Sequence, residues 1–292
     1  MNTKQEVRTF YDQIGWSQAG EGLYQNARYE DLRPVVRDYI HRCHLRVNRY
    51  LDPTGTLFLD AGSGPVQYPE YLTYSEGYRY RVCADISITA LKEARQRLGE
   101  KGLYVVMDIA NLPFKAATFD GVISLHTIHH LPAADHRKAY AELYRVLGPG
   151  RRAVVVNGWS DPPLMRPFHA LAPFVSRGLA RLSRGQHSGG TASNQMSGSP
   201  PAVETSPAPS APFAPTGTFV HKSNAKWLRG QLQGLVPIQI FVWRSVSTKF
   251  TRTYIHAKLA GRLKLRFIYW LEERLPRFLG ENGQYPLVSI QK

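Results

Sequence analysis

The chain has 292 residues, of which 43% are hydrophobic, so it can form one large domain or two modest ones around a proper core. Its only cysteines, Cys43 and Cys83, lie far apart within apolar stretches. This argues against a disulfide framework or a thiolate zinc site and is typical of a reducing cytoplasm. No signal-peptide core and no run of about 18 apolar residues occurs, so we expect a cytoplasmic protein that does not cross a membrane.

Positive charge is concentrated in the second part of the chain. The formal net charge is +15 at pH 7, and residues 1–160 hold 20 Lys and Arg against 17 Asp and Glu, whereas residues 161–292 hold 17 against 5. Such an imbalance indicates an anionic partner for the second part, namely lipid headgroups, nucleic acid or an acidic substrate. A basic surface that serves only solubility is the alternative interpretation.

Residues 1–51 are predicted to form a helical cap. Val7, Phe10, Tyr11 and Ile14 recur on one helical face, and apolar residues at three- and four-residue spacings continue over 35–47. We expect this cap to precede a sheet.

Residues 52–160 are predicted to form the core of an α/β fold. Apolar runs without alternation occur at Leu57–Leu59, Tyr80–Ala84, Leu103–Met107, Gly121–Leu125 and Ala153–Val156. Such runs are typical of strands buried on both faces. Helical segments at Ser87–Leu98 and Ala133–Leu147 separate some of them, so the pattern predicts a doubly wound, Rossmann-like and mostly parallel sheet.

The remaining sequence is predicted to carry an insertion and then to complete the sheet. Residues 161–187 form an amphipathic basic helix in this interpretation, and 24 of the 30 residues at 188–217 are Ser, Pro, Gly, Ala or Thr, a composition typical of a disordered linker. Residues 218–292 are expected to contribute a helix near 224–233, a strand near 238–246, a basic helix near 259–275 and a last strand at 285–290.

A glycine-rich segment, LFLDAGSGPVQYPEY, includes the end of the first predicted strand. Gly62 and Gly64 allow a tight turn and a close approach of the backbone to a ligand. Asp60 would repel a pyrophosphate but suits a ligand that carries an ammonium group. Gln67 stands where the dinucleotide fingerprint has its third glycine. Both features favour S-adenosylmethionine over a nicotinamide dinucleotide.

Two further acids end the next two predicted strands. Asp85 lies 25 residues after Asp60, close to the spacing at which an acid accepts hydrogen bonds from ribose hydroxyls. Asp108, in VVMDIANLPF, can accept a hydrogen bond from an adenine amino group. A single Asp at a strand end is also a common helix cap or turn former, but three at successive strand tips favour a cofactor site.

These motifs resemble those of the class I S-adenosylmethionine-dependent methyltransferases of the small-molecule type. The resemblance covers residues 52–160 and rests on DAGSG at 60–64, Asp85, DIANLPF at 108–114, FDGVISLHTIHHL at 119–131 and AYAELYRVLGPGRRAVVV at 139–156. It implies that the glycine loop contacts the methionine part of the cofactor, that Asp85 binds the ribose and that Asp108 with Ile109 recognises adenine. Val66 stands where many members have a third glycine.

Tyr11, in FYDQIGW, resembles an aromatic residue that some members fold over the cofactor, and packing in the core is its alternative role. The full set of cofactor-binding residues that we expect is Tyr11, Asp60, Ala61, Gly62, Gly64, Asp85, Ile86, Asp108, Ile109 and Ser124.

The acceptor is expected beside the tip of the fourth strand, in SLHTIHH. His126 is the first candidate for substrate contact or general base, and His221, in TFVHKSN before a predicted helix, is the second. Ordinary backbone-bonded or helix-entry histidines are the alternatives. His41 and His44 lie three residues apart without further ligands, so we expect a metal-independent enzyme.

Three functions fit the sequence. The favoured one is methyl transfer to a small or lipid-like acceptor by in-line displacement. An RNA methyltransferase that uses the basic second part is less favoured, because Ser124, Leu125 and His126 stand where adenine-N6 enzymes carry a Pro-Pro-aromatic motif, and a non-catalytic S-adenosylmethionine-binding protein is the third. The basic amphipathic segments also predict a lid over the substrate that can rest on an anionic membrane surface. The oligomeric state cannot be deduced from the sequence.

Overall fold

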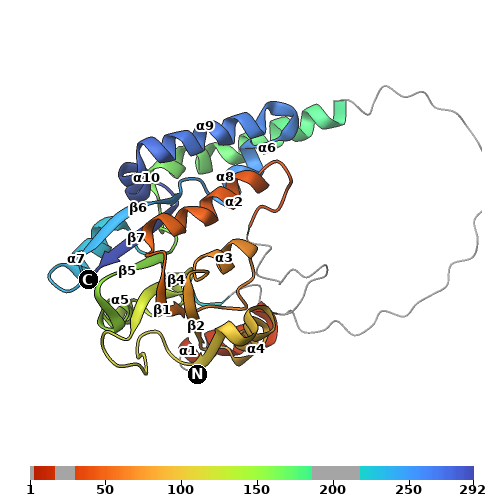
Figure 1. The fold of residues 1–292 in the computed structure, drawn as a ribbon. Helices are drawn as coiled ribbons and strands as arrows, with labels where there is room; N and C mark the ends of the chain where they lie inside the picture. Colours follow the sequence, from red (N-terminus) through yellow and green to blue (C-terminus); the bar gives the residue numbers. More distant parts are fainter. Residues whose placement is uncertain (1–2, 17–29, 186–217) are drawn as a thin grey trace, which may run out of the picture.

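The computed structural model describes residues 3–16, 30–185 and 218–292, with only the backbone described for 178–185. The predicted disordered linker at 188–217 therefore lies outside the described residues. A seven-stranded sheet forms the centre of the fold (Figure 1). Its strands are β1 (Gly55–Ala61), β2 (Tyr78–Asp85), β3 (Gly102–Val106), β4 (Phe119–Leu125), β5 (Leu147–Val156), β6 (Ile238–Arg244) and β7 (Tyr285–Gln291).

The strand order is β3-β2-β1-β4-β5-β7-β6. The first five strands in the chain are parallel, and β7 is antiparallel to both β5 and β6. In the register, Asp60 of β1 pairs with Cys83 of β2 and with Ile123 of β4. The carboxyl ends of β1, β2 and β4 therefore meet at one edge of the sheet, which confirms the doubly wound, Rossmann-like fold class.

Successive strand residues alternate between two apolar cores because neighbouring side chains point to opposite faces. Leu59 packs into one core with residues of α5 (Ala133–Val146) and α7 (Ala225–Leu232). Phe58 packs into the other with residues of α2 (Arg37–Leu45), α4 (Ile88–Leu98), α8 (Thr248–Tyr254) and α9 (Gly261–Arg274). Burial on both faces explains why the strands read as continuous apolar runs.

The helix boundaries follow local caps and connections. Side chains of Ser87, Asn224 and Ser247 accept backbone N–H bonds at the starts of α4, α7 and α8. The remaining α-helices are α1 (Thr3–Phe10), α3 (Pro69–Thr73), α6 (Arg166–Gly185) and α10 (Pro276–Asn282). Short 3-10 turns occur at η3 (Arg46–Tyr50), η4 (Gly99–Lys101), η5 (Ile128–His130), η6 (Pro163–Met165) and η7 (Ala257–Leu259), and η1 (Tyr11–Gly15) is a π turn.

The N-terminal residues lie in two places rather than in one continuous cap. In Figure 1, α1 lies near α4, whereas α2 lies on the other side of the molecule near α9. The side chain of Asp12 in η1 accepts a hydrogen bond from Ser87 at the start of α4, at 2.6 Å. Arg46, at the start of η3, donates to Glu272 of α9 at 3.0 Å. Among the described helices, none is both long enough and apolar enough to cross a membrane.

Candidate cofactor and acceptor site

A cavity of about 620 Å³ lies at the carboxyl ends of β1, β2 and β4. One end is lined by the loops after these strands and by α1 and η1, including Lys4, Phe10 and Tyr11. The other end is lined by His126 after β4, by Trp243 and Arg244 at the end of β6 and by Tyr285 at the start of β7. This volume lies within the range of about 300 to 1,000 Å³ that is common for small-molecule sites.

The loop after β1 has a backbone conformation that requires glycine. Gly62 and Gly64 have φ values of 78° and 54°, a region that glycine adopts without strain. A Cβ on Gly62 would lie 2.2 Å from the side chain of Thr127, so no other residue fits there. Val66 keeps a φ of 53° with a buried side chain, which shows that the loop retains its left-handed turn without a third glycine.

Asp85 connects the glycine loop to the second strand. Its carboxylate accepts hydrogen bonds from the backbone N–H of Gly64 and of Ser87, each at 2.9 Å. Burial nevertheless raises the pKa of Asp85 to about 6. The carboxyl group lines the cavity, as expected for a residue that accepts hydrogen bonds from a ribose.

Asp60 does not stand alone at the strand tip as the sequence argument assumed. Its Oδ2 accepts hydrogen bonds from Nε of Arg81 at 3.2 Å and from Nη2 of the same guanidinium. Arg81 comes from β2 and is 1% exposed. Asp60 still lines the cavity, but one of its oxygens is already paired. The only sequence signal for this pair was Arg81 itself, the one charged residue in the run Tyr80–Ala84.

Asp108 is bound by the N-terminal helix. Lys4 of α1 donates to Oδ2 of Asp108 at 2.6 Å and also pairs with Asp135 at 2.7 Å. Burial would raise the pKa of the Asp108 carboxyl, but hydrogen bonds from Lys4 and from the backbone N–H of Ala110 outweigh it and hold the pKa below its usual value. Helix α1 therefore covers the end of the cavity where the resemblance places adenine.

Aromatic residues continue this cover. The ring of Tyr11 stacks on Trp16 with centroids 5.2 Å apart, and its hydroxyl lies 2.8 Å from Nε2 of His130. Ile86 and Ile109 line the cavity beside Asp85 and Asp108. The structure thus brings Tyr11, Asp60, Gly62, Gly64, Asp85, Ile86, Asp108 and Ile109 together around one cavity.

Three of the predicted residues do not line this cavity. Ala61 and Ser124 are fully buried within strands. The backbone N–H of His221 donates to the carbonyl of His129 at 2.7 Å, but its ring contacts His136 and Trp227, and a second, small cavity borders it. Lys222, the next residue, lines the main cavity instead.

His126 stands at the acceptor end, directly after β4. Its φ is 57°, a strained value for a non-glycine residue. The ring contacts Trp243 at 5.0 Å and Tyr285 at 5.9 Å between centroids. Burial lowers the pKa of His126 to about 3 and that of His130 to about 4. Both imidazoles are therefore neutral at pH 7.

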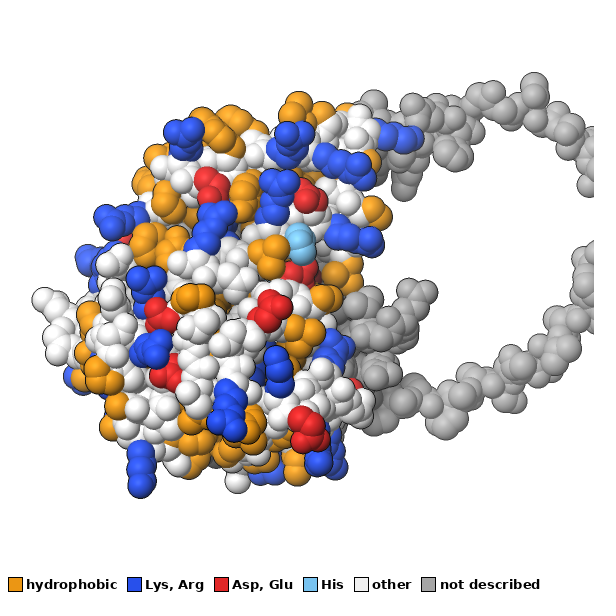
Figure 2. Space-filling view, in the orientation of Figure 1, with side chains coloured by type: hydrophobic (Ala, Val, Ile, Leu, Met, Phe, Trp, Pro, Cys, Tyr) orange, Lys and Arg blue, Asp and Glu red, His pale blue; other side chains and the backbone are white. Residues whose placement is uncertain are grey.

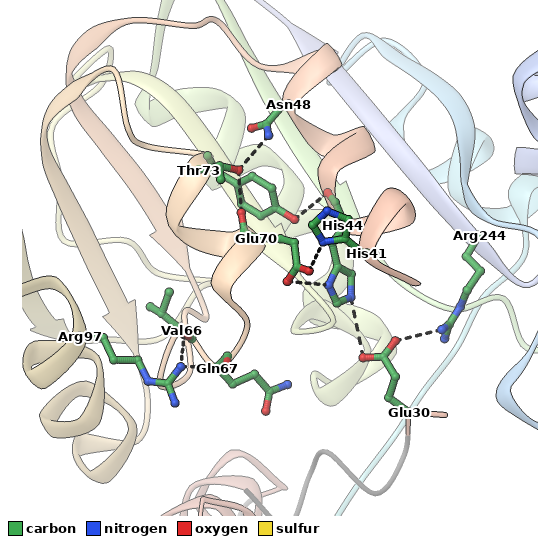
Figure 3. Close-up of polar contacts among 11 residues, drawn as sticks. Glu30, His41, His44, Asn48, Val66, Gln67, Glu70, Thr73, Arg97 and Arg244 are labelled. Carbon is green, nitrogen blue, oxygen red and sulfur yellow. Dashed lines mark hydrogen bonds and ion pairs between the residues drawn. The ribbon is translucent and has the colours of Figure 1, made fainter. Parts of the chain in front are cut away.

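A chain of polar residues behind the acceptor end escaped the sequence analysis (Figure 3). Glu30 accepts a hydrogen bond from Nη1 of the buried Arg244 at 2.9 Å. The ring of His44 lies between Glu30 and Glu70, with N–O distances of 3.8 and 3.5 Å, and stacks on Trp243 at 5.5 Å. Glu30 and Arg244 line the cavity, although 214 residues separate them in the chain.

Metal ligands do not gather anywhere in the described ranges: no three His, Cys, Asp or Glu side chains there lie close enough to share an ion. Glu70 contacts a ring nitrogen of both His41 and His44. Metal independence stays a prediction.

Known proteins resemble this chain in sequence and in fold. Residues 59–155 match the family described as "Methyltransferase domain". The sequence is 30% identical over 167 residues to "Probable tRNA methyltransferase 9B" of Mus musculus, covering 56% of this chain and 36% of that protein. It is 27% identical over 166 residues to "Sterol methyltransferase-like 1" of Botryococcus braunii, covering 53% and 41%. The chain thus spans less than half the length of these two relatives.

The fold extends beyond the matched domain. A solved geranyl diphosphate methyltransferase, in complex with GPP and sinefungin, superposes with a TM-score of 0.52 at 14% identity over 99% of both chains. Residues 59–155 are therefore a methyltransferase domain, and the sheet has the class I, Rossmann-like fold of S-adenosylmethionine-dependent methyltransferases. The cavity fits S-adenosylmethionine, because Gly62 and Gly64 line it and the buried carboxylate of Asp85 lies next to them.

Proposed function

We propose that the protein transfers a methyl group from S-adenosylmethionine to a small or lipid-like acceptor, without a metal ion. The observation that carries this proposal is the continuous cavity that joins the strand-tip acids to the aromatic residues around His126. The cofactor supplies a methyl group on a sulfonium centre, whose positive charge is lost on transfer. Positioning of the acceptor and exclusion of water then provide most of the acceleration.

Residues at one end of the cavity are proposed to bind the cofactor, and residues at the other end to bind the acceptor. Asp85 and Asp108 are proposed to hold the ribose and the adenine, while Lys4 and Tyr11 close the cavity over them. His126 is proposed to contact the acceptor. Its neutral ring can accept a hydrogen bond from a hydroxyl or amine acceptor and can take the proton as the transferred methyl group makes the acceptor acidic. His221 has no place in this arrangement because it does not line the cavity.

Turnover assays test the proposal. The protein is incubated with methyl-labelled S-adenosylmethionine and a panel of sterols, quinols, phenols and fatty acids, and labelled product is separated from cofactor. We expect methylation of at least one acceptor, and EDTA should leave the rate unchanged. Loss of turnover with EDTA that Mg²⁺ or Zn²⁺ restores would disprove metal independence. Cofactor binding without turnover on any acceptor, RNA included, would favour the non-catalytic alternative.

RNA is the second candidate acceptor. The relatives named as tRNA methyltransferases and the basic second part of the chain favour it. The aromatic walls around the acceptor end favour a small molecule, because the cavity of about 620 Å³ has the size of a small-molecule site. Incubation with total tRNA separates the two: incorporation of label into tRNA that falls steeply with salt would replace the small-molecule proposal.

We also propose that the outer helices rest on an anionic membrane surface. On α9, Leu263, Phe267 and Trp270 are 66%, 58% and 50% exposed, so this ridge does not pack on the domain. Arg266 and Arg274 flank it, and Figure 2 shows basic and apolar side chains interspersed on the part of the molecule where Figure 1 draws α9 and α6. Charge complementarity and exposed aromatics together suit anionic lipid headgroups.

The basic segments were also expected to form a lid over the substrate. Among the described helices in this second part of the chain, only α6 and α8 contribute residues to the cavity and support this proposal. His169 of α6 and Lys249 of α8 line the cavity, whereas no residue of α9, all of which are described, does so. On α6, Phe168 contacts Phe250 and Tyr254 of α8, while Leu171 and Phe174 stay exposed. Side chains are not described for Arg181, Leu182 and Arg184, which belong to the predicted amphipathic basic helix at 161–187.

A further inference from the structure

Arg244 is a buried guanidinium, and most of its donors have no acceptor in the part of the chain that the structure describes. It ends β6, is 3% exposed and lines the acceptor end of the cavity. Its one hydrogen bond within the described residues runs from Nη1 to Glu30, and its buried Nε has no acceptor. A guanidinium offers five N–H donors in a planar fork, and unpaired buried donors are costly. Among the described residues, its surroundings therefore lack an acceptor group.

The charges around Arg244 indicate what this group is. Lys222 and Lys249 line the same cavity, and neither forms an ion pair or hydrogen bond with another described residue. Glu30 is the one acid among the described lining residues of this end, and it already accepts hydrogen bonds from Arg244 and Tyr68. Burial would raise the pKa of Glu30, but the charge of Arg244 holds it below its usual value. The described residues at this end thus include three cationic side chains but only one carboxylate, that of Glu30, which already accepts hydrogen bonds.

The walls beside these cations are aromatic. Tyr68 and Tyr71 lie with ring centroids 5.2 Å apart, and Trp243 and Tyr285 with centroids 5.7 Å apart; all four line the cavity. The guanidinium of Arg244 lies 4.5 Å from the ring centroid of Tyr285. A ligand bound here would therefore contact flat apolar ring surfaces next to the guanidinium of Arg244.

We propose that the methyl acceptor is an apolar molecule that carries an anionic oxyacid group, a carboxylate or a phosphate, which pairs with Arg244 and Lys222. This inference rests on the proposed function, since it assigns the acceptor of the same cavity. Arg244 binds the oxyacid through its free donors in the bidentate manner that guanidinium groups favour. The apolar body lies against the aromatic walls, next to His126.

Calorimetry on protein saturated with S-adenosylhomocysteine tests the inference. The probes are benzoate, phenyl phosphate, benzamide and benzylamine. We expect benzoate or phenyl phosphate to bind at least about tenfold more tightly than benzamide, as charge-assisted pairing requires, and benzylamine not to bind. Whichever of the two anions binds more tightly identifies the oxyacid. Equal binding of benzamide and both anions would overturn the inference.

Variants locate the binding group. Arg244→Lys keeps the charge but removes the fork, and Lys222→Gln removes a neighbouring charge without disturbing a buried pair; each should lose most of the preference for the anion. Lys226→Gln, on the exposed surface of α7, is the matched control and should keep it. A preference that survives in both cavity variants contradicts the assignment. Failure of the wild-type protein to bind S-adenosylhomocysteine would instead disprove the proposed function.

Discussion

The carboxylate of Asp60 and the guanidinium of Arg81 form an ion pair that is almost completely buried beneath the glycine loop, at 3% and 1% exposure. The two residues lie on adjacent parallel strands, and Arg81 also donates to the backbone carbonyl of Tyr71 at 2.5 Å. The pair links the end of β1 to α3. It fixes the strand from which the cofactor loop begins.

Removing the cation of this pair should destabilise the whole domain. In Arg81→Leu the charge of Asp60 stays buried without a partner, so we expect the free energy of unfolding at pH 7.5 to fall by about 3 to 5 kcal/mol. Urea unfolding followed by circular dichroism measures it. Arg79→Leu, on the exposed side of the same strand, is the control and should stay close to wild type. A change below about 1 kcal/mol in Arg81→Leu would contradict a structural role for the pair.

Asp85→Ala should weaken cofactor binding. The substitution leaves the ribose hydroxyls without their acceptor and also frees the N–H of Gly64 and of Ser87, so we expect a loss of about 1.5 to 3 kcal/mol in binding free energy. Titration calorimetry with S-adenosylhomocysteine provides the value, and a thermal melt confirms that the variant is folded. Unchanged affinity in a folded variant would remove Asp85 from the cofactor site.

The pH dependence of cofactor binding should also report on Asp85. Its pKa of about 6 lies above the ordinary value of 3.8. The folded protein without cofactor therefore favours the neutral carboxyl more than the unfolded chain does. This contribution to stability is present below pH 4 and is lost as the pH rises through 6. The affinity for the cofactor has the opposite pH dependence, because the ionised carboxylate is the form that accepts hydrogen bonds from both ribose hydroxyls. We expect affinity for S-adenosylhomocysteine to rise between pH 5 and 7.5; a flat profile would show that another group binds the ribose.

His126→Asn separates catalysis from cofactor binding. Asparagine tolerates the left-handed φ of this position, so the backbone should keep its path. We expect turnover to fall by about 100-fold or more where the acceptor must lose a proton, while the affinity for S-adenosylhomocysteine stays unchanged. His136→Asn, on the buried side of α5 and away from the main cavity, is the control. Equal turnover in wild type and His126→Asn would assign the ring to packing alone.

The sequence predicted the sheet and one half of the cavity because both depend on local patterns. The apolar runs locate every strand of the core, and the acids at 60, 85 and 108 follow strand ends that parallel pairing brings together. Lys4, Glu30 and Arg244 lack such a pattern. Each reaches the cavity from an element remote in the chain, and no periodicity specifies which helix covers a strand tip.

His221 shows that a local pattern can locate a residue without specifying where its side chain points. Its position before a helix was read correctly, since Asn224 caps α7 three residues later. The segment, however, passes behind His129, so the ring turns toward His136 rather than the acceptor. The approach of two segments 92 residues apart decides this orientation, and sequence spacing does not encode it.

The exposed ridge of α9 provides the last prediction. Co-sedimentation with liposomes that contain phosphatidylglycerol should show binding at low salt, because each basic residue near an anionic surface contributes about 1 kcal/mol. Binding should weaken as salt rises and fall further in the double variant Phe168→Ser and Phe267→Ser, since both side chains are exposed. Leu72→Ser, an exposed apolar residue on α3, is the control and should bind like wild type. Protein that remains in the supernatant at low salt with anionic vesicles would refute membrane contact and leave only the proposed lid formed by α6 and α8.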